Sequence, residues 1–484
     1  MTRATGLRFD EASKWVLDPR AGETLRACLE RTLRDAIREG SLRAGVELPA
    51  SRLLAGQLRV SRGVVSDAYA ELEAQGYLRV SPRRAPVVAD VVSARGPARV
   101  GPPRARAEAP IRFDMTPTTP DVSLFPRRPW AAALAAAVRE APSPALDYGD
   151  PRGTFVLRER LADELGRTRG AICDPEQVFV VQGATQGVDL ALRALRDAGA
   201  ARIAVEDPSL DRQHRQIAGL GLELVGQPVD GSGLIVAGLD ADAVVVSPAH
   251  QFPTGAVLAG TRRRELLDWS RATGGLVIED DYDAEFRYDR EPVRALQGLH
   301  PDGVIYLGTT SKTLAPALRL GWMIVPKAMT ERLAALKELL DDLSPTLEQL
   351  ALARWLERGH YQRQIRRMRG VYRDRRDRLV AALADHLPEL SVSGVAAGLS
   401  VTLNLPASTD DREIERAARA AGIRVEALSR YAVQDHGRRG LVIGYGRLHE
   451  SAISSAISAL SEVIRQATPA RELAAARIEE AVRR

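Results

Sequence analysis

Lysine is scarce in this chain, so a lysine within a motif is informative. The 484-residue sequence has 68 basic residues, and its only lysines are Lys14, Lys312, Lys327 and Lys337. A lysine amine can act as a nucleophile, whereas the guanidinium of arginine cannot. Lys312 follows an apolar run and lies among hydroxyl residues, in the stretch Thr309-Thr-Ser-Lys-Thr-Leu-Ala-Pro-Ala-Leu-Arg319. Covalent chemistry at Lys312 is the hypothesis here, and a solvated surface lysine is the alternative.

The residues around Lys312 predict a cofactor that carries both an aldehyde and a phosphate. Lys312 can form a Schiff base with the aldehyde. The phosphate can be held by Arg319, Thr309 and Ser311. This combination is typical of pyridoxal 5'-phosphate. A predicted helix start offers further backbone N–H groups to that phosphate, at Gly183, Ala184 and Thr185.

An apolar strand that ends in acidic residues supplies partners for the ring of such a cofactor. The stretch is Gly275-Leu-Val-Ile-Glu-Asp-Asp-Tyr282. A carboxylate paired with the pyridinium nitrogen keeps the ring an electron sink, and a phenol can hydrogen-bond the ring hydroxyl. We assign Asp280 and Tyr282 to these roles, with Asp281 as the rival carboxylate. A surface acidic turn or a magnesium site would also explain these residues.

The elements that must position these residues form an α/β pattern beyond residue 110. Short apolar runs bounded by polar or turn residues predict strands at Val178–Val181, Ile203–Val205, Ala243–Val246, Gly275–Ile278 and Val304–Leu307. Such runs indicate a mostly parallel sheet covered by helices. Polar clusters follow each run, and in this kind of sheet they converge on one ligand site beyond the strand ends. Helices dominate from about residue 330, and a smaller α/β portion is expected from about residue 390, with strands over 399–405 and 440–445.

The N-terminal part predicts a separate winged helix-turn-helix. Apolar residues at i, i+4 spacing predict a helix over 24–39. Two shorter helices are expected over 52–58 and 62–74, with Ser51 and Ser61 as their N-caps. Two β-rich pieces, 77–80 and 86–89, then predict a hairpin that serves as the wing.

This winged helix-turn-helix indicates double-stranded promoter DNA as a partner. Residues 1–110 hold 19 Lys and Arg against 13 Asp and Glu, while the whole chain has a net charge of +5, so the basic excess is N-terminal. The start of the second helix of such a motif reaches base edges, and nearby groups contact phosphates. The candidate DNA-binding residues are Ser51, Arg52, Ser61, Arg62, Arg83 and Arg84. Each arginine could instead be an ordinary surface charge.

The domain boundaries follow from composition. We expect a DNA-binding domain over 20–90, a Pro- and Arg-rich linker over 91–110, a cofactor domain over 111–470 and a helical tail over 471–484. Cys28 and Cys173 are too few for a disulfide framework or a CxxC metal site, which favours a reducing compartment and no bound metal. The sequence has neither the apolar core of a signal peptide nor a membrane-length apolar run, so a cytoplasmic protein is expected.

Longer motifs resemble a known family. Residues 20–90 are similar to a GntR-type winged helix, through Leu48-Pro-Ala-Ser-Arg52 and the segment 60–78. Residues 110–470 resemble a fold-type-I aminotransferase. Together they resemble the MocR/GabR family of bacterial regulators, whose hallmarks appear as Tyr148-Gly-Asp-Pro-Arg-Gly153, Ser247-Pro-Ala-His-Gln-Phe-Pro-Thr-Gly255 and Glu279-Asp-Asp-Tyr-Asp-Ala-Glu-Phe-Arg-Tyr288.

The resemblance implies further roles and shows two departures. It implies a head-to-tail homodimer in which Tyr148 reaches the phosphate of the partner's cofactor, and it places His250 near the ring. It also implies that Arg447 clamps a ligand carboxylate, with a structural salt bridge as the alternative. Relatives commonly have an aromatic residue where this chain has Leu210, so we consider Arg212 as a replacement effector contact. The usual glycine-rich wing tip is replaced by Ser81-Pro-Arg-Arg84.

The resulting functional hypothesis is a transcriptional regulator that depends on pyridoxal phosphate. Its aminotransferase-like domain would sense a small amino compound or pyridoxal phosphate itself, in the control of vitamin B6 synthesis or amino-acid metabolism. Leu210 slightly favours the cofactor as the signal. An active aminotransferase with an appended DNA-binding domain is the second hypothesis, and a decayed, purely structural domain is the third.

Overall fold

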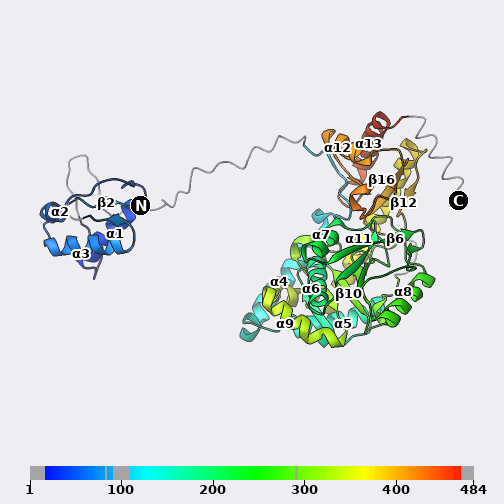
Figure 1. The fold of residues 1–484 in the computed structure, drawn as a ribbon, viewed down its shortest axis with the longest axis horizontal. Coiled ribbons are helices and arrows are strands. Elements are labelled where there is room, and N and C mark those ends of the chain that lie inside the picture. Colours follow the sequence, from blue (N-terminus) through cyan, green and yellow to red (C-terminus); the bar gives the residue numbers. More distant parts are fainter. Residues whose placement is uncertain (1–16, 82–83, 91–109, 289–292, 470–484) are drawn as a thin grey trace. The chain divides into compact units, whose positions relative to one another are not determined.

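The computed structural model describes residues 17–81, 84–90, 110–288 and 293–469. The chain forms two compact units, Met1–Glu108 and Ala109–Arg484 (Figure 1). Three sequence predictions lie largely or wholly outside the described residues: the linker, the C-terminal tail and the wing residue Arg83.

The first unit is the predicted winged helix-turn-helix. Its elements are α1 (Leu25–Arg38), α2 (Ser51–Leu58), α3 (Arg62–Ala74), β1 (Leu78–Arg79) and β2 (Val87–Val88). The two strands pair antiparallel, with Leu78 opposite Val88, and so form the wing. The i, i+4 stripe of α1 is buried against α3 from Leu29 onwards, and Leu29, Leu33 and Leu72 are fully buried.

The two predicted N-caps have different outcomes. Ser61 caps α3 as predicted, because its hydroxyl accepts a hydrogen bond from the N–H of Val64 at 3.4 Å. The prediction for Ser51 is wrong. Ala50 is the N-cap of α2, without a side-chain hydrogen bond, and Ser51 is already the first helical residue. A helical residue no longer has the extended backbone that turns a cap hydroxyl towards the N–H groups of the first turn.

The second unit is built on an eight-stranded sheet with the strand order β4-β11-β10-β9-β8-β5-β6-β7. The strands are β4 (Val178–Val181), β5 (Arg202–Asp207), β6 (Glu223–Asp230), β7 (Gly233–Leu234), β8 (Ala243–Val246), β9 (Leu276–Asp281), β10 (Val304–Thr309) and β11 (Gly321–Ile324). All but β7 and β11 run in one direction. The five predicted strands are confirmed, while β6, β7 and β11 were not predicted.

Helices cover both faces of this sheet, and successive strand residues alternate between the faces. Ile278, Ile305 and Leu307 pack in the same cluster as α6 (Ala184–Asp197). Tyr306 and Trp322 pack on the other face, with α5 (Phe155–Arg169), α10 (Thr346–Glu357) and α11 (His360–His386). The remaining helices of this part are α4 (Arg127–Glu140), α7 (Asp211–Gly219), α8 (Gly260–Thr273) and α9 (Thr330–Asp341). The α6 face is called the front here, and the α5 face the back.

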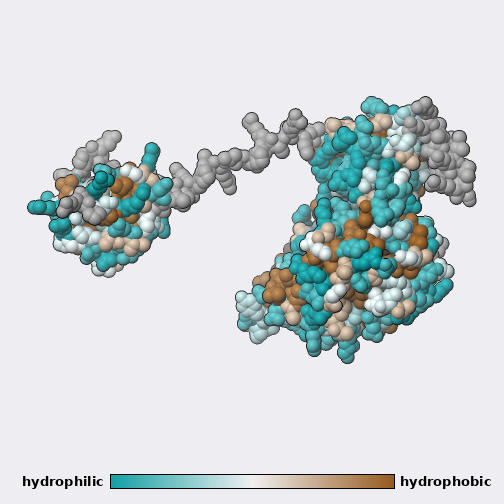
Figure 2. Space-filling view, viewed as in Figure 1, coloured by the Kyte–Doolittle hydropathy of each residue, from teal (hydrophilic) through white to brown (hydrophobic). Residues whose placement is uncertain are grey.

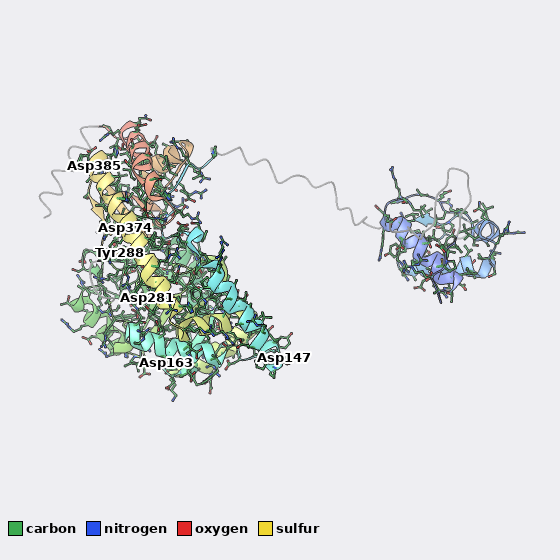
Figure 3. The ribbon with its side chains drawn as sticks, turned by 180° about the vertical axis from the view of Figure 1, so that it is seen from behind. Asp147, Asp163, Asp281, Tyr288, Asp374 and Asp385 are labelled. Carbon is green, nitrogen blue, oxygen red and sulfur yellow. The ribbon has the colours of Figure 1, made fainter. Side chains whose placement is uncertain are left out.

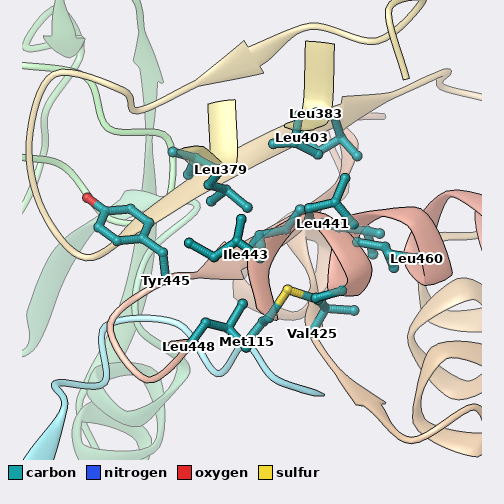
Figure 4. Packing of buried hydrophobic residues seen from close by; sticks show 14 of the residues in the cluster. Met115, Leu379, Leu383, Leu403, Val425, Leu441, Ile443, Tyr445, Leu448 and Leu460 are labelled. Carbon is teal, nitrogen blue, oxygen red and sulfur yellow. The ribbon is translucent and has the colours of Figure 1, made fainter. Parts of the chain in front are cut away.

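The predicted smaller α/β portion is also present. A four-stranded sheet contains β12 (Val392–Ser393), β13 (Ser400–Leu405), β16 (Arg439–Gly444) and β15 (Glu426–Ala427), and a short pair joins β3 (Phe113–Asp114) to β14 (Ile423–Arg424). Helices α12 (Asp411–Ala420) and α13 (Ile453–Ala467) belong to this portion. The C-terminal half of α11 packs on it, and Figure 4 shows Leu379 and Leu383 against Leu403, Leu441 and Ile443.

Candidate functional site

Lys312 lies just beyond the end of β10, as predicted. Its side chain is partly buried, and within the described ranges no residue forms a hydrogen bond or ion pair with its amine. Burial and the positive charge of Arg212 lower the pKa of Lys312 to about 8, while Asp283 and Asp280 oppose this effect. A larger share of the amine is therefore neutral near physiological pH than for an ordinary lysine. The neutral amine is the form that attacks an aldehyde.

A cradle for a phosphate lies between Lys312 and the start of α6. Gly183 is the N-cap of α6 and has φ +88°, a conformation that favours glycine. A Cβ on Gly183 would lie 3.2 Å from two nitrogens of Arg319, whose guanidinium also donates to the carbonyl of Gln182. The hydroxyls of Thr309 and Ser311 are 2.9 Å apart on the adjoining turn. The structure thus gathers a helix N-terminus, a guanidinium and two hydroxyls, the donors that bind phosphate groups.

Asp280 lies on the front face at the end of β9, buried to 4% exposure. One carboxylate oxygen accepts a hydrogen bond from the side-chain amide of Gln213 at 2.9 Å. The other, Oδ1, is buried without a partner among the described residues. Burial and the neighbouring Asp281 together raise the pKa of Asp280 to about 6, against the opposite effect of Lys312 and Arg212. A buried acceptor without a donor is rare in folded proteins, so Oδ1 is suited to a ligand N–H.

Tyr282 and His250 lie together beside Asp280. The Tyr282 hydroxyl is 3.1 Å from Nδ1 of His250, and the same nitrogen is 3.0 Å from Oδ2 of Asp283. Burial raises the pKa of Tyr282 well above its ordinary value, so its hydroxyl stays protonated. Nε2 of His250 is buried without a partner in the described part of the chain. The resemblance placed His250 near the ring, and the structure places it against Tyr282.

The loop and helix after β5 complete this side of the site. Arg212, on α7, donates to the hydroxyl of Thr185 at 2.5 Å. Leu210 packs against a small cluster that includes Phe252 and Tyr282. Sequence reasoning missed Gln213 and Asp283, the partners of Asp280 and His250. A usable signal was present for Gln213, because it is the next residue after Arg212.

Several polar residues at strand ends point away from Lys312. Asp281, the rival of Asp280, lies on the back face, where it pairs with Arg169 at 2.5 Å and accepts from the Tyr306 hydroxyl at 2.6 Å. Asp207 belongs to the polar cluster after the predicted strand Ile203–Val205, and these clusters were expected to converge on one site. Its carboxylate instead binds the smaller portion, accepting backbone N–H groups of Val433 and Gln434 at 2.8 and 3.0 Å.

Two residues implied by the resemblance also lie apart from these contacts. Arg447 forms an ion pair with Asp114 at 2.7 Å. Tyr148 is 84% exposed. Their roles towards an effector and towards the partner's cofactor remain predictions.

The first unit presents its candidate DNA-binding residues at the surface. Arg62 is the first residue of α3, and its side chain is exposed, as are those of Ser61 and Arg52. Arg84, in the wing, is exposed, and Ser51 is half-buried. An exposed arginine at the start of the second helix of a helix-turn-helix is positioned for a base edge or a phosphate.

Family models match both units. Residues 25–88 match the model for bacterial regulatory proteins of the gntR family, and residues 123–441 match that for aminotransferase class I and II. The fold and the site thus define a DNA-binding protein whose larger domain is of the aminotransferase class. The predicted winged helix and aminotransferase-like α/β fold are both confirmed.

Relatives with the same two-domain arrangement identify the family. The chain is 33% identical over 451 residues to the pyridoxine biosynthesis regulator PdxR of Corynebacterium glutamicum, covering 93% of this chain and 98% of PdxR. It is 30% identical to the probable rhizopine catabolism regulatory protein MocR of Rhizobium meliloti, covering 92% and 94%. The chain belongs to this family of HTH-type transcriptional regulators, the MocR/PdxR type.

The larger domain also has solved structural neighbours. A kynurenine aminotransferase from Pyrococcus horikoshii, solved in complex with PMP, matches with a TM-score of 0.68 and 24% identity, over 73% of this chain and 91% of that one. Pyridoxal 5'-phosphate is the cofactor that this class of domain implies. The residues present fit it, because Asp280 has a buried oxygen to which no described residue donates, and Arg319 lies over the start of α6. In the described ranges, no helix is both long and apolar enough to cross a membrane.

Proposed function

We propose that this regulator is a cytoplasmic sensor of pyridoxal 5'-phosphate that controls vitamin B6 synthesis. The observation that carries the proposal is a contrast within the larger domain. Among the described residues, the lysine on the cofactor side has no partner and one carboxylate oxygen has no donor. The two arginines predicted for an effector carboxylate already have partners, because Arg212 binds Thr185 and Arg447 binds Asp114. The similarity to PdxR, a pyridoxine biosynthesis regulator, supports the same signal.

Each residue of the site has a defined task towards the cofactor. When bound, pyridoxal phosphate supplies a reactive aldehyde and an electron-withdrawing ring. Lys312 would hold it covalently, and Asp280 would keep a proton on the ring nitrogen. Tyr282 would donate its hydroxyl proton to the ring oxygen and be positioned by His250. The phosphate would be held by Arg319, Thr309, Ser311 and the backbone N–H groups of Gly183, Ala184 and Thr185.

The first unit would bind promoter DNA through the start of α3. Arg62 and Ser61 would lie in the major groove, while Ser51, Arg52, Arg83 and Arg84 would contact the backbone. Such arginine contacts make the affinity strongly dependent on salt.

A head-to-tail homodimer is part of the proposal. Apolar side chains are exposed around α4 and α5, with Val138, Phe155 and Leu146 at 55%, 52% and 62% exposure and Tyr148 close by in the sequence. Figure 2 shows hydrophobic residues gathered at the surface near α4. An exposed apolar patch of this kind is suited to association with another protein surface. We expect Tyr148 to enter the partner's cofactor site from this patch.

The test measures DNA affinity with and without pyridoxal phosphate. Genomic DNA fragments selected by the full-length protein would be titrated by fluorescence anisotropy, with wild type, Lys312→Ala and Lys327→Ala. Lys327 is an exposed lysine and serves as the matched control. We expect the cofactor to change the Kd about tenfold for wild type and Lys327→Ala, and not for Lys312→Ala. An equal response of Lys312→Ala, or no response of wild type, would contradict the proposal.

A steady-state assay with amino and keto acids separates this function from that of an aminotransferase. The residues that we propose for the cofactor are also those that such chemistry needs, so single turnovers are compatible with a sensor. Sustained multiple turnover would favour the enzyme instead.

A further inference from the structure

The residue just before the phosphate cradle, Gln182, is held at three points. Its backbone N–H donates to Oε1 of Gln186 at 2.7 Å, and its side-chain amide donates to Oδ2 of Asp341 at 3.1 Å. Its backbone carbonyl accepts from the guanidinium of Arg319. Gln182 joins the end of β4 to Gly183, the N-cap of α6. The three contacts therefore fix the place at which α6 begins.

Gln186 connects this residue to the same carboxylate. It is the third residue of α6, and its side-chain amide also donates to Oδ2 of Asp341, at 2.7 Å. A glutamine at this position can reach back over the helix start, and here its oxygen accepts the N–H of Gln182. Both ends of the Gln186 amide are thus used. One end holds the chain before the cap, and the other end holds Asp341.

A buried ion pair lies behind these contacts. Lys337 and Asp341 are four residues apart on α9, which packs against α6 (Figure 1). Nζ of Lys337 is 2.8 Å from Oδ1 of Asp341, and the lysine is fully buried. Oδ2 of Asp341 remains for the two glutamine amides. The positive charge of Lys337 offsets the negative charge of Asp341, so the pair does not repel a phosphate at the start of α6.

Stability alone does not account for this ion pair. Taking charged groups out of water is costly, and apolar residues of similar volume often replace a buried ion pair without loss of stability. Orientation is a use that such a pair serves well, because a carboxylate held by a buried lysine accepts hydrogen bonds from fixed directions. Here the donors in those directions are the amides of Gln182 and Gln186.

The network lies on the front face of the sheet, with the residues of the cofactor side. Leu333 of α9 packs in the same cluster as α6 and Ile278. Figure 3 shows the unit from behind, where Asp281 lies beside α11 on the opposite face. Among the described residues, the Gln182 carbonyl is the one acceptor of the exposed Arg319 guanidinium. The direction in which Arg319 meets a phosphate therefore depends on how this carbonyl is held.

We propose that the side chains of this network are positioning residues for the phosphate of pyridoxal 5'-phosphate. They are Gln182, Gln186, Asp341 and Lys337. They fix the carbonyl that holds Arg319 and the N–H groups that begin α6, so that both sets of donors meet the phosphate in one arrangement. The inference deepens the proposed function, and it rests on the assignment of the phosphate to Arg319 and the start of α6.

The network thereby sets the preference of the site for the phosphorylated form of vitamin B6. A sensor of pyridoxal phosphate has to distinguish it from pyridoxal, which carries the same ring and aldehyde. The phosphate is the group that differs, so its donors determine the discrimination. Donors without fixed positions lose conformational freedom when the ligand binds, and this loss weakens the affinity. The network fixes them before the ligand arrives.

The test compares pyridoxal 5'-phosphate with 5'-deoxypyridoxal. The second compound keeps the ring and the aldehyde, lacks the phosphate and cannot close into the internal hemiacetal that pyridoxal forms. Both are titrated by absorbance into the full-length, cofactor-free protein, where each attaches to Lys312. The measured quantity is the ratio of the two Kd values. A change that only loosens the fold raises both Kd values, whereas a loss of positioning raises that of the phosphorylated ligand alone.

Two variants remove the network in different ways. Lys337→Met combined with Asp341→Leu replaces the ion pair with apolar side chains. Gln186→Met keeps the ion pair, removes the acceptor of the Gln182 N–H and keeps the test decisive if the double variant fails to fold. We expect each to raise the Kd of pyridoxal phosphate about tenfold, and that of 5'-deoxypyridoxal by less than about twofold.

A matched control is present on α6. Arg193 and Asp189 also form an i, i+4 ion pair, at 2.7 Å, beyond the first turn of the helix. Arg193→Met combined with Asp189→Leu removes this pair by the same substitutions and should leave the ratio of the Kd values unchanged. Calorimetric unfolding of the cofactor-free proteins checks that each variant is folded.

Two results would overturn the inference alone. One is a wild-type ratio in both network variants, and the other is an equal rise of both Kd values, while Arg319→Met loses the preference for the phosphorylated ligand. If Arg319→Met keeps that preference, the assignment of the phosphate is wrong, and the inference fails with it. No DNA is present, so these outcomes are independent of whether pyridoxal phosphate controls DNA binding.

Discussion

Replacing either of the two adjacent carboxylates at the end of β9 with asparagine should have opposite effects on the stability of the cofactor-free protein and different effects on cofactor affinity. Asp280 lies on the front face with one oxygen free for a ligand, whereas Asp281 lies on the back face in an ion pair with Arg169. We compare Asp280→Asn with Asp281→Asn, because each keeps the size of the side chain and removes its charge. The variants separate cofactor binding from folding.

Asp280→Asn should weaken cofactor binding. Under the proposed assignment, the substitution would replace a charge-assisted hydrogen bond to the ring nitrogen with a neutral one, and a hydrogen bond to a charged group contributes about 1.5–3 kcal/mol. This corresponds to an increase of about 10- to 150-fold in the Kd for pyridoxal phosphate. Asp281→Asn leaves every front-face contact in place, and we expect it to change this Kd by less than about threefold.

The stabilities of the cofactor-free proteins should move in opposite directions. Burial raises the pKa of Asp280 to about 6, above its ordinary value of about 4. The folded state then binds the proton more tightly than the unfolded chain does, so stability falls as the pH rises from about 4 to about 6. At pH 7 the ionised carboxylate costs about 3 kcal/mol, and Asp280→Asn removes this cost. Asp281→Asn leaves Arg169 buried without its partner and should cost about 3–5 kcal/mol.

Absorbance titration with pyridoxal phosphate and calorimetric unfolding of the cofactor-free proteins measure the two effects. The expected result is weaker binding with a higher Tm for Asp280→Asn, and near-normal binding with a lower Tm for Asp281→Asn. A larger loss of cofactor affinity in Asp281→Asn than in Asp280→Asn would refute the assignment of the two faces.

Three further predictions concern the lysine, the DNA-binding unit and the link between the two portions of the larger domain. In the cofactor-free protein, the rate of pyridoxal phosphate attachment should rise with pH around a midpoint near 8, the pKa of Lys312, and Arg212→Met should move this midpoint upwards, as followed by stopped-flow absorbance. Arg62→Ala should weaken binding to a selected DNA site by about 1–3 kcal/mol and, if Arg62 contacts a phosphate, lower the salt slope by about one, as measured by anisotropy. Asp207→Ala strands two backbone N–H groups and should destabilise the larger domain by at least about 2 kcal/mol in calorimetry, more than His436→Ala, which removes only the outer contact.

The positions of the polar site residues could be predicted because they follow from the order of apolar and polar residues along the chain. Apolar runs that end in polar residues define strand ends, and strand ends in a parallel sheet meet along one edge. This reasoning placed Lys312, Asp280, Tyr282 and Thr185 in one region, and the structure has them there. The prediction failed for Asp207. A strand end determines where the backbone of Asp207 lies, but the partner of its carboxylate comes from a loop more than two hundred residues later.

The pairing of side chains from distant segments carried no signal in the sequence. Gln213 is the residue after Arg212, and Asp283 lies within the motif 279–288, but neither position indicates that Gln213 contacts Asp280 or that Asp283 contacts His250. Arg169 closes a helix far from β9, and only the folded sheet brings it to Asp281. The strand β11 was missed because it follows directly on the Lys312 motif, and that segment was interpreted only through its polar, cofactor-binding residues. Its apolar run over 320–325 was a usable signal.

The choice between Asp280 and Asp281 shows how far sequence reasoning could have gone. Side chains alternate along a strand, so the face of either residue follows from the faces of Ile278 and Val277. Ile278 packs with the α6 cluster and Val277 with the opposite one, which places Asp280 on the front face and Asp281 on the back face. Which face carries the site depends on where α6 begins, because Gly183 and Arg319 bring the phosphate donors to that face. The alternation of side chains along β9 and the position where α6 begins together determine which of the two carboxylates is assigned to the site. Neither is sufficient alone.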